Sequence, residues 1–157
     1  MVLQIQLEHL QAIRAHAEST YPEECCGLLL GKFTSDRKEL LEVRPTENAW
    51  QEETARELGQ ELAASGTIAP LTKERRYIIK PAEMLRVIKE ARSRDLSLIG
   101  VYHSHPDHPA IPSECDRQLA WPEYSYIIVS VLQGKAGEIL TWNLDEENQF
   151  QAESFEF

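Results

Sequence analysis

Two periods of hydrophobic spacing run along this chain, one typical of strands and one typical of helices. Near the start, Leu3, Ile5 and Leu7 alternate with polar residues, which predicts a short strand. Spacings of three and four residues then predict an amphipathic helix that ends before Pro22, with a core-facing stripe of Leu7, Leu10, Ile13, Ala17 and Tyr21. A similar spacing beyond Pro81 predicts a second helix, with a buried stripe of Met84, Leu85, Ile88 and Ala91. We expect both helices to flank a sheet.

Short apolar runs rich in β-branched and aromatic residues predict the strands of this sheet. The predicted strands cover residues 26–30, 39–43, 77–79, 98–102, 124–132, 138–144 and 150–152. The polar stretch 34–37 joins the first two, which are expected to form a hairpin. Strands interspersed with helices, without an internal repeat, predict a mixed α/β (α+β) fold with one twisted, mixed central sheet flanked by helices.

Composition and charge narrow the class of protein. A chain of 157 residues with 42% apolar and 27% charged residues fits a single domain over residues 1–157. The formal charge of -10 argues against unaided binding to nucleic acid or to an anionic membrane. The apolar runs are too short for a membrane span, no basic and hydrophobic leader opens the chain, and three cysteines make a poor disulfide framework. We therefore expect a cytoplasmic protein, whose oligomeric state the sequence does not indicate.

The stretch from Gly100 to Asp116, GVYHSHPDHPAIPSECD, gathers candidate metal ligands at the end of an apolar run. Successive side chains of a strand point to opposite faces, so His103 and His105 share one face. Ile99 and Val101 are expected on the same face. Two imidazoles on one face can reach a single cation.

A third ligand is expected from the segment that follows the proline-rich connector. Residues 113–116 are typical of the first turn of a helix, and Ser113 and Asp116 lie three apart on one helical face. If this helix end faces the strand end, Asp116 joins the two histidines. Two histidines and one carboxylate leave a fourth tetrahedral position open, as in a catalytic zinc site. Taken alone, Ser-x-x-Asp is most often a helix cap, and His108 in its proline turn is expected to be a polar surface residue.

These residues resemble the motif of a known family. The sequence HSHP at residues 103–106, followed after six residues by S-x-x-D at 113–116, matches the JAMM (MPN-plus) metalloprotease motif. Glu24, within PEECCGLLLG, matches the catalytic glutamate of that family. The resemblance covers nearly the whole chain and implies a cytidine-deaminase-like fold, although the zinc deaminase signature itself is absent.

The resemblance implies a zinc metallopeptidase and a role for each residue of the motif. His103, His105 and Asp116 hold Zn2+, which lowers the pKa of a bound water from about 15.7 toward 7. Glu24 accepts the proton of that water and later donates it to the leaving amine. The hydroxyl of Ser113 donates to the oxygen that becomes negative, a contribution of about 3 kcal/mol.

The substrate is also an expectation from resemblance. The chain is similar to small peptidases that act behind the C-terminal Gly-Gly of ubiquitin-like sulfur carrier proteins and release cysteine or a C-terminal extension. A deubiquitinase-like isopeptidase acting on lysine-linked conjugates is the alternative enzyme. Two alternatives are not enzymes. The first is a non-catalytic scaffold, and the complete ligand set argues against it. The second is a storage or regulatory zinc site in which Cys25 or Cys115 closes the fourth position.

Residues 50–76 look like an enlarged insertion. Family members commonly pass more directly from the asparagine at Asn48 to the strand at Tyr77. The sequence predicts a weakly amphipathic helix over residues 50–64 and a loop over 65–76. In similar peptidases this region borders the active-site groove, so we expect either a substrate-contacting flap or a plain surface elaboration.

Overall fold

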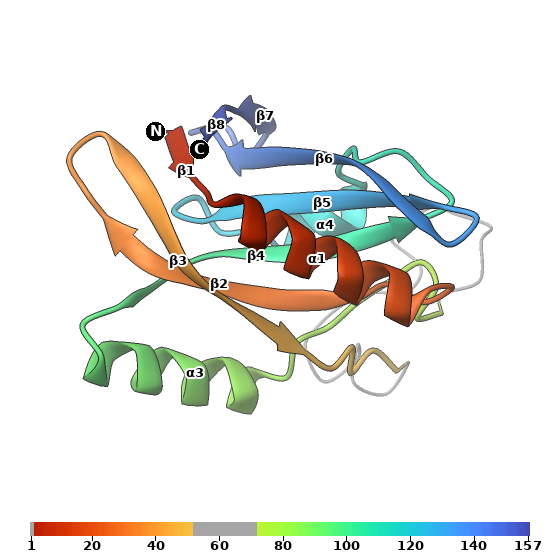
Figure 1. The fold of residues 1–157 in the computed structure, drawn as a ribbon, viewed down its shortest axis with the longest axis horizontal. Helices are drawn as coiled ribbons and strands as arrows, with labels where there is room; N and C mark the ends of the chain where they lie inside the picture. The colour runs from red at the N-terminus through yellow and green to blue at the C-terminus, as the bar shows by residue number, and fades with distance from the viewer. Residues whose placement is uncertain (1, 52–71) are drawn as a thin grey trace.

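Eight strands form one sheet in the computed structural model, which describes residues 2–51 and 72–157 (Figure 1). Their order across the sheet is β7-β6-β5-β4-β2-β3-β1-β8. The strands are β1 (Val2–Gln4), β2 (Cys26–Phe33), β3 (Arg37–Thr46), β4 (Ser97–Pro106), β5 (Ser125–Leu132), β6 (Lys135–Leu144), β7 (Phe150–Glu153) and β8 (Phe155–Glu156). The described helices are α1 (Leu7–Thr20), α3 (Pro81–Ser93) and α4 (Glu114–Leu119).

The sheet is mixed, as predicted. β4 pairs in parallel with β5, and β1 pairs in parallel with β3 and β8, whereas the other neighbours are antiparallel. The predicted hairpin of β2 and β3 is confirmed, and β3 extends to include Pro45. This proline is tolerated because β1 covers β3 only at residues 37–39, so the far edge of β3 has no strand partner at Pro45 among the described residues. Gln133 and Gly134, with φ of 50° and 84°, make a shorter turn into β6 than the sequence suggested.

The two helices that were predicted from periodicity cover opposite faces of the sheet. Figure 1 shows α1 crossing in front of β4 and β5, with α4 behind them. Leu10, Ile13 and Ala17 of α1 enter one buried cluster, and Val87 and Ala91 of α3 enter the other. Two positions of the predicted stripes were wrong. Leu7 begins its helix and is 54% exposed, and Leu85 is 53% exposed because Val87 occupies the face that meets the sheet.

A bulge in β4 changes which side chains share a face with the histidines. Leu29 pairs with Gly100 but Leu30 pairs with Leu98, so Ile99 has no partner of its own on β2. Ile99 consequently packs in the cluster on the α1 side, while Val101 packs in the cluster on the α3 side. The expectation that Ile99 and the histidines share a face was therefore wrong, and only the expectation for Val101 is confirmed.

The short strand predicted at residues 77–79 was also wrong. This segment has no strand ladder, and its backbone is held by the amide of Ile78, which donates to Asn48 Oδ1 at 3.2 Å, and by the carbonyl of Ile78, which accepts from Ala49 at 2.9 Å. Most of the predicted helix over 50–64 and most of the predicted loop over 65–76 lie outside the described residues. Among the described helices, none is long and apolar enough to cross a membrane.

A buried polar cluster links three strands that are not neighbours. Lys38 on β3 donates to Ser125 on β5 at 2.7 Å and to Glu153 on β7 at 3.0 Å, and Ser125 donates to Glu153 at 2.6 Å. The side chains of Lys38 and Glu153 are 5% and 0% exposed. The sheet therefore curls until its two sides meet over these residues. The amide of Leu3, which donates to the carbonyl of Ser154 at 3.1 Å, completes the closure.

Candidate active site

The end of β4 and the start of α4 bring three candidate ligands together. His103 Nε2 lies 3.2 Å from Asp116 Oδ1, and His105 Nε2 lies 3.1 Å from Asp116 Oδ2. The two Nε2 atoms are 3.1 Å apart. All three side chains are buried, and one ligand atom from each falls within 4.8 Å of the others. The helix end thus faces the strand end, which is the condition that the sequence required for Asp116 to join the histidines.

A capping box at the start of α4 holds Asp116 in place. The amide of Asp116 donates to Ser113 Oγ at 3.1 Å, and the amide of Ser113 donates to Asp116 Oδ2 at 2.8 Å. The capping role of the Ser-x-x-Asp pair is therefore present, and it aims the carboxylate at the histidines. Because Ser113 Oγ is an acceptor in the cap, its own hydroxyl hydrogen remains to be donated elsewhere.

The orientation of the histidines suits a cation between them and Asp116. His105 Nδ1 lies 2.8 Å from the carbonyl oxygen of Pro109, which can only accept, so Nδ1 carries a hydrogen and Nε2 is the nitrogen available to a cation beside Asp116. His103 stacks on Tyr77 with ring centroids 4.5 Å apart. Two imidazoles and a carboxylate whose acceptor atoms converge make a ligand set that a divalent metal satisfies.

The charge states of the buried groups fit the same conclusion. Burial lowers the pKa of His103 against the opposing effect of Asp116, so its ring tends to be neutral. Burial also disfavours ionisation of Asp116, but the charge that His103 carries when protonated, together with hydrogen bonds from His103 and His105, outweighs it and holds the pKa of Asp116 well below its usual range. A neutral His103 and an ionised Asp116 are in the protonation states in which these side chains bind metals.

Glu24 reaches the same place from the loop before β2. It is 4% exposed, and its Oε1 has no hydrogen-bond partner among the residues that the structure describes. Burial, with a contribution from the charge of Asp116, raises the pKa of Glu24 well above its usual value, while Arg76 and Arg75 act in the opposite direction. A carboxyl group that holds a proton more readily than usual is suited to acid–base chemistry.

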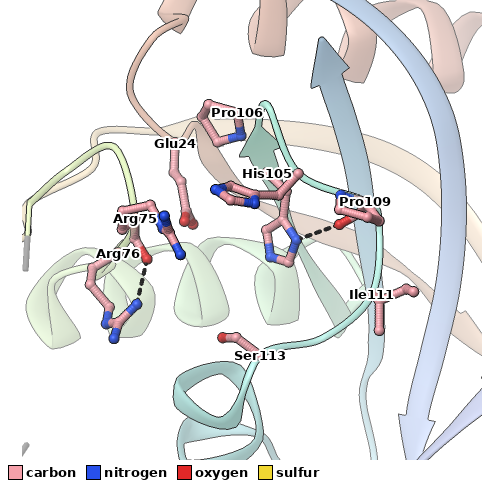
Figure 2. Close-up of a pocket in the computed structure, with 9 residues that line it drawn as sticks. Glu24, Arg75, Arg76, His105, Pro106, Pro109, Ile111 and Ser113 are labelled. Carbon is pink, nitrogen blue, oxygen red and sulfur yellow. Dashed lines mark hydrogen bonds between the residues drawn. The ribbon is translucent and has the colours of Figure 1, made fainter. Parts of the chain in front are cut away.

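A cavity of about 220 Å³ is lined by Glu24, His105 and Ser113. Figure 2 shows Glu24 and Arg75 on one side of it, the ring of His105 beside them and Ser113 at the opposite wall. His108 is exposed, as expected from its proline turn, but it also lines this cavity. The predicted site residues His105, Ser113 and Glu24 therefore line the same cavity as His108, which was expected to be only a polar surface residue.

Asn48 is a part of the site that the sequence reasoning missed. Its Nδ2 donates to the carbonyl oxygens of Glu24 at 3.0 Å and Arg76 at 2.9 Å. Its Oδ1 accepts from the amides of Trp50 at 3.0 Å and Ile78 at 3.2 Å. This buried amide thus fixes the backbone of the candidate base against the segment that carries Arg75, Arg76 and Tyr77. A polar residue soon after a predicted strand gave no signal of this role, because the partners are brought together only by the fold.

The cysteines stay apart from the candidate ligands. Cys25 and Cys26 are buried, and burial raises the pKa of each thiol to about 12, which keeps both protonated. Within the described residues, the group of converging ligand atoms contains two histidines and one aspartate and no cysteine. The geometry therefore gives no support to a site closed by Cys25 or Cys115.

The fold and the site define a mixed α/β protein with a candidate two-histidine, one-carboxylate metal centre beside a buried glutamate. Residues 6–145 match the family of prokaryotic homologs of the JAB domain, and the chain belongs to this family. The family and the mixed fold that the sequence predicted are confirmed.

Curated relatives are 28–30% identical to this chain over the residues that align. It is 30% identical to a desampylase of Haloferax volcanii over 122 residues, which are 77% of this chain and 72% of the relative. It is 28% identical to the CysO-cysteine peptidase of Mycobacterium tuberculosis over 144 residues, which are 91% and 83% of the two chains. It is 30% identical to a probable TtuB-protein conjugate cleaving protease of Thermus thermophilus, covering 82% of this chain and 70% of that one.

Solved structures show the same fold. A protein from Desulfitobacterium hafniense superimposes with a TM-score of 0.75 at 25% identity and covers 99% of this chain and 92% of its own. A JAB1/MPN domain protein from Archaeoglobus fulgidus superimposes with a TM-score of 0.51 at 19% identity, covering 99% and 98% of the two chains. The second match bears on the fold alone.

Proposed function

We propose that this protein is a zinc-dependent peptidase that hydrolyses the bond after the C-terminal Gly-Gly of a ubiquitin-like sulfur carrier protein. The observation that carries the proposal is the buried Glu24, which shares a cavity with His105 and Ser113 beside the converging ligand atoms. The names of the relatives support the substrate class, since they include a CysO-cysteine peptidase, a desampylase and a TtuB-conjugate protease.

Each side chain has a distinct task in this proposal. His103, His105 and Asp116 hold the metal, and a zinc ion bound there supplies a Lewis acid that makes water acidic enough to attack near neutral pH. Glu24 takes the proton of the attacking water and passes it to the departing nitrogen. The Ser113 hydroxyl, whose hydrogen the helix cap does not use, donates to the substrate oxygen that gains negative charge.

The proposal is tested by incubating the zinc-loaded protein with ubiquitin-like sulfur carriers that bear residues beyond Gly-Gly and reading the products by intact mass. We expect cleavage after the second glycine, and we expect a chelator to abolish it. Absence of cleavage for every carrier tested with the metal bound would contradict the proposed peptidase. Cleavage of only lysine-linked conjugates would replace it with the isopeptidase alternative.

Removal of one ligand is expected to remove the metal. His103→Ala leaves two candidate ligands, which is fewer than a zinc site of this kind requires. We expect zinc content in the purified variant, measured by elemental analysis, to fall from about one equivalent to a small fraction. His108→Ala is the matched control, because His108 lies in the cavity but outside the group of ligand atoms, and it should keep the metal. Full zinc content in His103→Ala would overturn the ligand assignment.

Loss of the Ser113 hydroxyl is expected to slow catalysis more than it weakens the fold. Ser113→Ala should lower kcat by about 10²- to 10³-fold, as for the loss of an oxyanion donor. It also removes the helix cap, at about 0.5–2 kcal/mol of unfolding free energy. Thermal unfolding identifies a temperature at which the variant remains folded, and kcat is measured there. Ser113→Thr keeps a hydroxyl and should recover much of the rate, whereas normal kcat in Ser113→Ala would remove the proposed role.

A further inference from the structure

Two consecutive arginines, Arg75 and Arg76, line the cavity on the side of Glu24 (Figure 2). Both act electrostatically on Glu24, and Arg75 also acts on His108. The whole chain carries a formal charge of -10, so the two positively charged arginines beside the candidate metal centre are opposite in sign to the net charge of the protein. A cavity wall of this kind is suited to hold an anionic part of a ligand.

The backbone that carries the arginines is tied to the backbone of Glu24. The amide of Glu24 donates to the carbonyl of Lys73 at 2.7 Å. Asn48 bridges the carbonyl of Glu24 and the carbonyl of Arg76. The positions of the two cationic residues are therefore set by the same hydrogen bonds that set the position of the candidate base.

The simplest alternative is that the arginines only neutralise Glu24. Among the residues that the structure describes, however, neither arginine forms an ion pair with Glu24 within 4 Å, and Glu24 Oε1 has no hydrogen-bond partner. Arg76 Nη1 instead donates to the carbonyl of Arg75 at 2.8 Å. Neither guanidinium group therefore closes on the base, and the cavity that both arginines line together with Glu24 leaves space for a substrate group.

The proposed reaction fixes which substrate group can lie there. One water is consumed: its oxygen bonds to the glycine carbonyl carbon, the C–N bond breaks, and a proton goes from Glu24 to the departing nitrogen. That nitrogen must lie within about 2.6–3.2 Å of Glu24 for the transfer. If the leaving group is a C-terminal amino acid, its carboxylate carbon is only two bonds of about 1.5 Å away from this nitrogen. The carboxylate therefore lies on the Glu24 side of the cavity. A departing lysine side chain has no charge of this kind near its nitrogen.

We propose that Arg75 and Arg76 bind the α-carboxylate of the leaving residue, so that the protein prefers to release a single C-terminal amino acid over cleaving a lysine-linked conjugate. This inference rests on the proposed peptidase and specifies its leaving group. Guanidinium groups suit the task because they form two parallel hydrogen bonds with a carboxylate and stay charged at all relevant pH values.

The test compares two forms of one substrate. A ubiquitin-like sulfur carrier ending in Gly-Gly-Ala is prepared with either a free C-terminal carboxylate or a carboxamide, and kcat/KM is measured for both. A hydrogen bond to a charged group contributes about 1.5–3 kcal/mol, so we expect the wild-type protein to favour the carboxylate by about 10- to 150-fold. The Arg75→Gln/Arg76→Gln variant should lower this ratio to near one. Both substrates use the same Glu24, so any effect of the substitutions on the base cancels in the ratio.

The controls separate this inference from the proposed function. Arg92→Gln removes an exposed arginine of α3 and should keep the wild-type ratio. Equal cleavage of both substrates by the wild-type protein, or an unchanged ratio in the double variant, would overturn the carboxylate site while leaving the peptidase in place. If the zinc-loaded wild-type protein cleaves neither substrate, both proposals fall.

Discussion

Glu24→Gln is expected to lower kcat by about 10²- to 10⁴-fold while the protein keeps its zinc. The amide has nearly the same shape as the carboxyl group but cannot take up and release the proton. Glu24 belongs to the cavity but not to the converging group of ligand atoms, so the substitution leaves the metal ligands intact. Loss of rate without loss of metal is the result that distinguishes a base from a ligand.

The measurement needs rate and metal content from the same preparation. Single-turnover cleavage of a carrier substrate gives the rate, and elemental analysis gives the zinc content. Glu23→Gln is a matched control one residue away, because Glu23 is exposed and Glu24 is buried. We expect Glu23→Gln to cleave normally. A Glu24→Gln protein that also cleaves normally would remove Glu24 from the mechanism, and one that loses its zinc would make it a metal ligand.

Lys38→Met is expected to lower the free energy of unfolding by about 3–5 kcal/mol, as when one partner of a buried ion pair is removed. The substitution leaves Glu153, whose side chain is 0% exposed, with only Ser125 as a hydrogen-bonding partner from this cluster. Burying an uncompensated charge is far less favourable than exposing it to water. The effect should be large because the cluster joins β3, β5 and β7, which are not neighbours in the sheet.

Urea unfolding followed by circular dichroism measures this loss. Lys32→Met is the control, since Lys32 is exposed on β2 and its replacement should change the unfolding free energy by less than about 0.5 kcal/mol. The double variant Lys38→Met/Glu153→Leu removes both charges and should regain much of the loss. A loss below about 1 kcal/mol in Lys38→Met would show that the ion pair does not stabilise the closed sheet.

The sequence predicted the strands and helices well where one periodicity extended over many residues. The runs that form β2, β4 and β5 are apolar on both faces, as in buried strands. The spacing of Leu10, Ile13 and Ala17 fits one face of a helix and does not fit a strand. The bulge at Ile99 could not be predicted, because alternation along one strand contains no information about the register of its partner. Residues 77–79 have strand-like composition but depend on Asn48, a contact that periodicity cannot indicate.

For the site, spacing along the chain was informative only for groups on the same element. His103 and His105 lie two apart on a strand, and Ser113 and Asp116 lie three apart at a helix start, so each pair could be oriented from local geometry. Arg75 and Arg76 carry no such local signal. A pair of arginines is usually a solvated surface feature, and only the fold shows that these two line the cavity beside Glu24.

Asn48 has a consequence for protein engineering. Its side chain bonds to the backbone on both sides of residues 52–71, through Trp50 before them and through Arg76 and Ile78 after them. Both ends of the stretch are therefore anchored by one residue, which also holds the backbone of Glu24. Asn48 is therefore the residue to keep in any variant in which residues 52–71 are shortened, extended or exchanged, because its loss would also release the backbone of the candidate base.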